Sequence, residues 1–91
     1  MKTDFSNSTE EEIDHFYKGI SSKVKYFRKN KNITQLDLAL DIGIKSVAFY
    51  SNCENNKYNK HFNLEHIYKI AKSLNIDILE LLQTQIINNN N

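Results

Sequence analysis

Two short helical patterns, separated by one glycine, constrain the fold of this chain more than any other feature of its sequence. The first pattern covers about residues 34–41 and can begin at Thr34, whose hydroxyl can accept a backbone N–H that the first turn leaves unpaired. The apolar residues on one face of this pattern are Leu38, Ala39 and Ile42. Gly43 then stands where a helix end needs a residue that adopts positive φ.

The second pattern covers about residues 47–54 and can be capped by the hydroxyl of Ser46. Its apolar stripe is narrow: Tyr50 and Cys53 recur at helical spacing and are expected to face inward. Two helices joined by so short a connection cannot lie antiparallel along much of their length. They must meet at an angle, so the sequence predicts a helix-turn-helix.

A long amphipathic segment precedes this unit. It begins at a capping-box pattern, Ser8-Thr9-Glu10-Glu11, and continues as one helical stripe through Asn30. The stripe consists of Ile13, Phe16, Tyr17, Ile20, Val24 and Phe27. Core packing is the simpler interpretation of these residues. The alternative is that the first three extend beyond the domain and help it to dimerise.

Two further helices are expected after the helix-turn-helix. Asn63 can cap the first of them, and Asp77 with Glu80 forms a capping-box pattern before the second, which is short. The apolar face of the first consists of Leu64, Ile67, Ile70, Ala71 and Leu74. The expected fold is therefore all-α, a compact five-helix bundle with a central helix-turn-helix and an extended N-terminal helix.

The composition agrees with a small helical protein. Of the 91 residues, 40% are hydrophobic and 25% are charged, and there are no prolines and two glycines, which favours helices in one soluble domain. The predicted domain spans residues 9–83, between a flexible N-terminus over 1–8 and a flexible Asn-rich tail over 84–91. A single cysteine excludes an internal disulfide, and no apolar run approaches the roughly 20 residues of a membrane span. The first residues do not begin a signal peptide, so the expected location is cytoplasmic.

The net charge of +1 becomes informative only when it is divided along the chain. Residues 1–14 contain one lysine and five acidic residues, so the remaining 77 residues carry a net charge of +5. A basic body behind an acidic segment suits a polyanionic partner. The excess is small, and charge alone decides little.

Four residue pairs in and around the two central helices resemble the core of the Cro/repressor-type (XRE) helix-turn-helix family. The pairs are Thr34-Gln35, Leu38-Ala39, Gly43-Ile44 and Glu54-Asn55. The resemblance runs from about Val24 to Leu82 and implies a lambda-repressor-like domain that binds DNA and regulates transcription. The chain departs from the family in a turn that is longer around Lys45, and in a longer loop after Glu54 that lacks the usual glycine and proline.

In such a unit the second helix enters the major groove of DNA by its N-terminal end. The resemblance, with which helical geometry agrees, implies base contacts by Ser46, Val47, Ala48, Ser51 and Asn52. The amide of Asn52 can pair with N6 and N7 of adenine together, and Val47 and Ala48 offer apolar surface for thymine methyl groups. The alternative for Asn52 is a solvated helix amide.

Contacts with the DNA backbone are expected from Gln35, Lys45, Asn55, Lys57, Tyr58 and Lys60. Gln35 lies in the first turn of its helix, where backbone N–H groups and the helix dipole favour an anion. The loop after Glu54 contains no acidic residue and alternates basic, amide and aromatic groups, which is typical of phosphate contact. A merely solvated loop is the alternative for Lys60. Asn56 is expected to take the left-handed conformation that glycine supplies in relatives.

Glu54 cannot favour phosphate, so we expect it to form an internal pair with Arg28, the only arginine. The sequence predicts no enzyme and no metal site. Cys53 has no flanking Gly-rich elbow, and its spacing from His61 and His66 fits no standard zinc finger. The chain also lacks a phosphate-cradling Gly-rich loop. No catalytic residue, metal, cofactor or small-molecule effector is therefore expected.

Two functions of different classes follow from these patterns. The first is a sequence-specific, dimeric DNA-binding regulator, similar to small phage-type repressors, that binds an inverted repeat of half-sites about one helical turn apart. The second is an antitoxin or protein-interaction module that uses the same fold without strong DNA binding. In that case Ile13 to Tyr17, or Leu82 to Ile87, would contact the partner protein.

Overall fold

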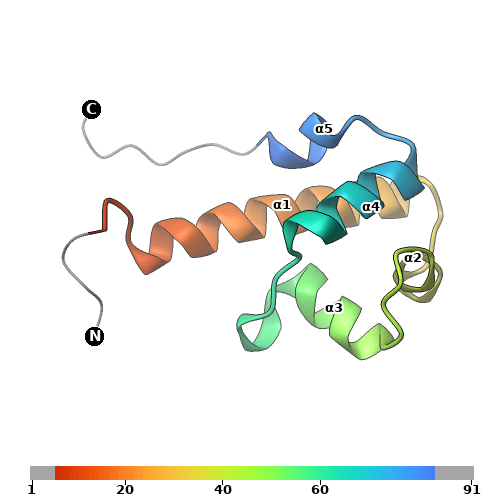
Figure 1. Ribbon diagram of the computed structural model, residues 1–91, viewed down its shortest axis with the longest axis horizontal. Coiled ribbons are helices and arrows are strands. Elements are labelled where there is room, and N and C mark those ends of the chain that lie inside the picture. Colours follow the sequence, from red (N-terminus) through yellow and green to blue (C-terminus); the bar gives the residue numbers. More distant parts are fainter. Residues whose placement is uncertain (1–5, 84–91) are drawn as a thin grey trace.

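The computed structural model describes residues 6–83, which form five α-helices and one 3₁₀ turn without any strand (Figure 1). The helices are α1 (Glu10–Asn30), α2 (Gln35–Asp41), α3 (Val47–Asn55), α4 (Leu64–Leu74) and α5 (Ile78–Leu82), and the 3₁₀ turn η1 covers Lys57–Asn59. The predicted all-α, five-helix fold is confirmed. The predicted flexible ends, apart from residues 6–8, lie outside the described residues.

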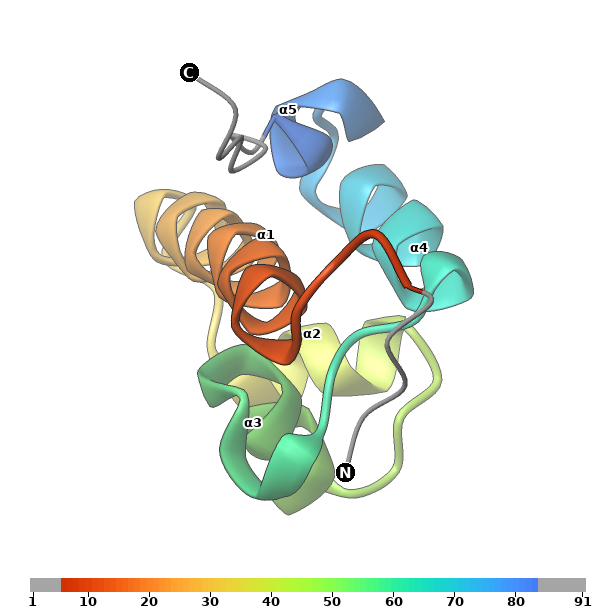
Figure 2. The ribbon, with the colours of Figure 1, turned by 90° about the vertical axis from the view of Figure 1, so that its left-hand side faces the viewer.

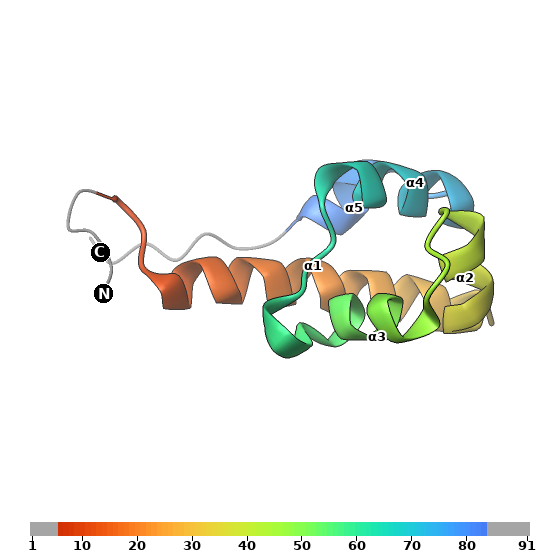
Figure 3. The ribbon, with the colours of Figure 1, turned by 60° about the horizontal axis from the view of Figure 1, so that its bottom comes forward.

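The long helix α1 organises the domain. It packs against α3, α4 and α5, while α2 packs against α3 and α4. Figures 2 and 3 show α3 and α4 on different sides of α1, with α2 across its C-terminal end. The N-terminal part of α1 extends beyond the other helices (Figures 1 and 3). The extended N-terminal helix is therefore confirmed.

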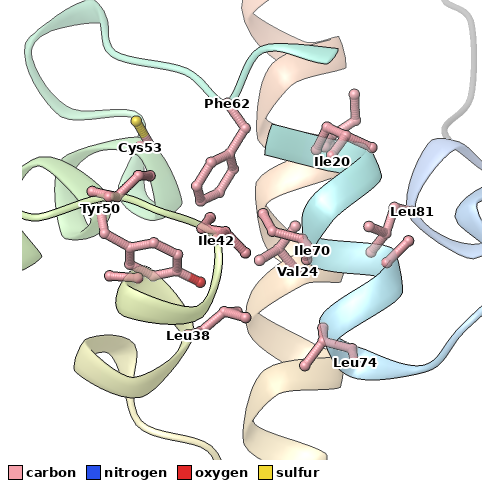
Figure 4. Packing of buried hydrophobic residues seen from close by; sticks show 14 residues of the cluster. Ile20, Val24, Leu38, Ile42, Tyr50, Cys53, Phe62, Ile70, Leu74 and Leu81 are labelled. Atoms are coloured by element: carbon pink, nitrogen blue, oxygen red, sulfur yellow. The ribbon is translucent and has the colours of Figure 1, made fainter. Parts of the chain in front are cut away.

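The core lies between α1 and the other four helices (Figure 4). Tyr50 and Cys53 are fully buried in it, as predicted from their spacing. Leu64, predicted to belong to the buried face of α4, is instead 79% exposed. It lies in the first turn of that helix, and Phe62, which is 5% exposed and 5.3 Å from the ring of Tyr50, fills this edge of the core. Ile13, at the start of the α1 stripe, is also exposed, at 45%.

Side-chain caps fix where the helices begin. The side chains of Thr34, Ser46 and Asn63 accept the backbone N–H groups of Asp37, Phe49 and His66 at 3.0, 3.1 and 2.8 Å, which confirms the three predicted caps. Each cap satisfies a donor that the first turn would otherwise leave unpaired.

Two other caps differ from the sequence prediction. The capping box of α1 is formed by Thr9 with Glu12, one residue later than predicted from Ser8. Asp77 caps α5 by accepting the N–H of Leu79 at 3.0 Å. The prediction from Ser8 failed because two adjacent hydroxyl residues precede acidic residues at the same spacing, so the pattern fits both registers.

Gly43 sets the angle between α2 and α3. Its φ is +84°, in the left-handed region, and the following N–H of Ile44 donates to the carbonyl oxygen of Ala39 at 2.8 Å. This bond ends α2 and turns the chain toward the cap of α3.

We expect the substitution Gly43→Ala to lower the free energy of unfolding by about 1–2 kcal/mol, the usual cost of a left-handed conformation for a residue with a Cβ. An added Cβ would meet no atom within 4 Å, so the cost is conformational rather than steric. Thermal unfolding followed by circular dichroism would measure it, at about 4–8 °C per kcal/mol for a domain of this size. Gly43→Asn should lose less, because asparagine tolerates this region. An unchanged melting temperature for Gly43→Ala would contradict the assignment.

Candidate nucleic-acid interface

The outer face of α3 is open to solvent. Ser46, Val47 and Ala48 are exposed, and Ser51 and Asn52 are half-buried. The predicted base-contacting residues therefore lie together on one side of α3, opposite Tyr50 and Cys53, which face the core. Figure 3 shows α3 at the margin of the domain, on the other side of α1 from α4. These five residues thus form one solvent-accessible face of α3.

A buried carboxylate network holds the C-terminal end of α3. Glu54 is 3% exposed and accepts hydrogen bonds from three side chains. Arg28 donates Nε to Oε2 at 2.8 Å and Nη2 to Oε1 at 2.9 Å, Tyr50 donates its hydroxyl to Oε2 at 2.7 Å, and Gln35 donates Nε2 to Oε1 at 2.9 Å. The predicted pair between Arg28 and Glu54 is confirmed. It joins α1 to α3, and Gln35 adds α2 to the same network.

The network keeps Glu54 ionised and neutralises its charge. Burial alone would raise the pKa of Glu54, but hydrogen bonds from Arg28, Gln35 and Tyr50 outweigh burial and hold that pKa below its ordinary value. The hydrogen bond with Glu54 raises the pKa of Arg28, and burial raises the pKa of Tyr50. At neutral pH the carboxylate next to the exposed face of α3 is thus paired inside the protein, where it repels a phosphate little.

Gln35 and Asn55, both predicted to contact the DNA backbone, are engaged within the protein. Gln35 is half-buried, and its amide nitrogen donates a hydrogen bond to Glu54. Asn55 donates Nδ2 to the carbonyl oxygen of Ser51 at 2.9 Å and accepts a bond from Lys25 Nζ at 2.9 Å. Sequence reasoning missed these roles. For Gln35 one signal was available: a buried carboxylate such as that of Glu54 has more acceptor positions than one arginine fills, so a further donor was to be expected.

The remaining backbone-contact candidates are exposed at the two ends of α3. Lys45 lies in the turn before the helix, and Lys57, Tyr58 and Lys60 lie in the loop after it. That loop contains η1, which was not predicted, and Tyr58 within it has a φ of +54° and is 78% exposed. Asn56 adopts the left-handed conformation as predicted, with a φ of +53°, and ends α3.

Cys53 and the histidines do not form a site. The buried thiol of Cys53 donates to the carbonyl oxygen of His61 at 3.4 Å, and burial raises its pKa, which disfavours the nucleophilic thiolate. Among residues 6–83 there is no group of three or more His, Cys, Asp or Glu residues arranged to hold a metal ion. In the same part of the chain, no helix combines the length and apolar composition needed to cross a bilayer.

Comparison with protein families gives a match to a helix-turn-helix family over residues 24–81, well over half of the chain. The matched part contains α2, the turn at Gly43, α3 and α4, and it agrees with the span predicted from the residue pairs. The family consists of DNA-binding regulators and is not enzymatic. Comparisons with curated proteins and with solved structures give no significant match. The chain therefore belongs to the Cro/repressor-type (XRE) helix-turn-helix family of DNA-binding regulators.

Proposed function

We propose that this chain is a sequence-specific transcriptional regulator that binds an inverted repeat as a homodimer and reads the major groove with the N-terminal part of α3. The observation that carries the proposal is the exposed face of α3, with an open N-terminal end and a C-terminal end fixed by the Glu54 network. A rigidly held helix can present its side chains to base edges in one orientation, which specific recognition requires.

The chemistry of this face suits sites that contain adenine and thymine. The amide of Asn52 can donate to N7 and accept from N6 of one adenine, while Val47 and Ala48 offer apolar contact to thymine methyl groups. Ser46 and Ser51 can donate to or accept from either kind of base. The hydroxyl oxygen of Ser46 accepts the backbone N–H of Phe49, and its O–H group remains able to donate to a base.

The lysines at the two ends of α3 support phosphate contact on both sides of a groove. The helix has nine residues and is therefore about 13 Å long, close to the roughly 12 Å width of the major groove. Lys45 precedes α3, and Lys57 and Lys60 follow it. Cations at both ends of a helix seated in the groove can meet the two flanking strands.

Selection of bound sequences from a random pool of DNA duplexes tests this function. The regulator should enrich an inverted repeat with half-sites about one helical turn apart, and its affinity should fall steeply as salt rises. Sedimentation of the complex should give two chains per repeat. A chain that enriches no sequence and binds DNA only weakly at physiological salt would be a protein-interaction module instead.

For the substitution Asn52→Ala, we expect binding to the selected sequence to weaken by about 1–3 kcal/mol, because one bidentate contact to a base is lost. Binding to unrelated DNA should not change, since that binding depends on phosphate contacts. A gel shift with the selected duplex and with base-substituted duplexes would measure both. Gln83→Ala, which removes an exposed amide beyond α5, is the control. Equal losses of affinity for Asn52→Ala and Gln83→Ala would show that Asn52 does not contact the DNA.

A further inference from the structure

We propose that a basic groove along α1 binds the phosphate backbone of the DNA beyond the base pairs that α3 reads. We call it the lysine groove and define it by Lys18, Ser22, Lys25, Lys29 and Asn55. It is a hollow of about 450 Å³ between α1 and the C-terminal end of α3. The inference rests on the proposed function and extends its contact surface to a helix that the base-reading unit does not include.

The three lysines of the groove share one face of α1. They recur at steps of seven and four residues, with Ser22 between them, so their side chains project toward the same side of the helix. From Lys18 to Lys29 the helix rises about 16 Å. Successive phosphates of one DNA strand advance about 3.4 Å along the duplex axis, so this length corresponds to about five phosphates.

The charge of the groove is not cancelled from within. Lys25 Nζ donates to the amide oxygen of Asn55, a neutral acceptor, at 2.9 Å, so its ammonium charge remains available. Lys29 is exposed and forms no ion pair with another of residues 6–83. Lys18 contributes less, because Asp14 pairs with it at 3.1 Å. The carboxylate that lines the groove, Glu54, is paired with Arg28 and fully covered.

The groove is continuous with the proposed DNA interface. Asn55 is the last residue of α3, and its bond with Lys25 ties the end of that helix to the floor of the groove. Lys57, two residues after Asn55 in the loop that follows α3, adds an exposed cation at this end of the helix. A DNA strand that contacts Lys57 can therefore run on along α1. This continuity favours the same DNA molecule over an acidic protein segment as the occupant.

The test compares two double variants that remove equal charge. The groove variant, Lys25→Gln with Lys29→Gln, removes the two groove lysines that are not paired with a carboxylate. Lys23→Gln with Lys72→Gln is the matched control, since Lys23 also donates to a neutral oxygen, that of Gln83 at 3.2 Å, and Lys72 is exposed on α4. Each variant would be titrated with the selected repeat, with and without about one helical turn of additional duplex on each side.

We expect the slope of log affinity against log salt to become shallower by about 0.9 for each groove lysine removed. The sequence preference should stay the same, because phosphate contacts carry no base information. Additional duplex should strengthen binding by the wild type and by the control but not by the groove variant. Lys25→Arg with Lys29→Arg should restore the slope. Circular dichroism would show that all variants keep their helices.

The two proposals fail in different ways. A groove variant with the wild-type salt slope and the wild-type gain from additional duplex would overturn the lysine groove and leave the proposed function intact. Equal losses in the groove variant and the control would also overturn it, because they would show a general effect of net charge. A wild-type chain that enriches no DNA would overturn both proposals.

Discussion

Replacing Arg28 with alanine is expected to lower the free energy of unfolding by about 3–5 kcal/mol. Arg28 supplies two of the four hydrogen bonds to Glu54, and its Nη1 also donates to the carbonyl oxygen of Ile33 at 2.8 Å. Without it, a carboxylate that is 3% exposed would be left without a compensating charge. Small domains are stable by only about 5–15 kcal/mol, so the variant should lose much of its stability.

Urea denaturation followed by circular dichroism measures this loss. Lys29→Ala, the neighbouring cation on an exposed surface, should change the free energy of unfolding by less than about 0.5 kcal/mol. Adding Glu54→Gln to Arg28→Ala should recover part of the loss, because the unpaired buried charge is then removed. If the free energies of unfolding of Arg28→Ala and Lys29→Ala agree within error, Arg28 does not compensate a buried charge on Glu54.

The effect of pH has a definite sign. The pKa of Glu54 in the folded protein lies below its ordinary value of 4.5, so the folded state binds this proton less readily than the unfolded state. The resulting stability is present above about pH 4.5 and is lost as pH falls through the folded pKa. The stability difference between the wild type and Arg28→Ala should therefore shrink in acid. A constant difference down to low pH would indicate that Glu54 is already neutral.

The features that the sequence predicted are mostly local. Thr34, Ser46 and Asn63 cap helices through bonds to residues three positions away, and the positive φ of Gly43 depends on its own missing side chain. The pair between Arg28 and Glu54 spans 26 residues, yet it was predicted, because a carboxylate beside a DNA-reading helix needs a partner and the chain has one arginine.

The features that the sequence did not predict depend on how distant segments pack. Gln35 meets Glu54 across 19 residues, and its type fits a phosphate contact equally well. Lys25 meets Asn55 across 30 residues, and the amide of Asn55, like that of Gln35, fits a phosphate contact equally well. Tyr17 of α1 stacks on His61 at 3.7 Å between ring centroids, which requires the loop before α4 to lie against α1. Periodicity within one helix carries no information about such pairs.

These long-range contacts have a common consequence for recognition. They fix the C-terminal end of α3 to α1 and α2, while the N-terminal end is capped by Ser46 and exposes Val47 and Ala48. Substitutions at the N-terminal end can therefore change DNA binding without disturbing the core. Ala48 is exposed in the first turn of α3, so a substitution there best separates an effect on DNA binding from an effect on stability.

Ala48→Glu is expected to lower the affinity for the selected DNA by at least about 100-fold, because a carboxylate would enter a groove lined by phosphates, and opposing like charges cost several kcal/mol. The free energy of unfolding should not decrease. No acidic residue occupies the first turn of α3, and a glutamate there interacts favourably with the helix dipole by about 0.3–1 kcal/mol. Fluorescence anisotropy with labelled duplex would measure affinity, and urea denaturation would measure stability.

Tyr68→Glu introduces the same charge at an exposed position of α4, which lies on a different side of α1 from α3. Long-range repulsion from one added charge is screened beyond about 8–10 Å at physiological salt, so this control should bind nearly as the wild type does. Ala48→Gln, with the same length and no charge, should fall between the two. A fully stable Ala48→Glu variant that still binds the selected repeat tightly would mean that another face of the domain reads the DNA.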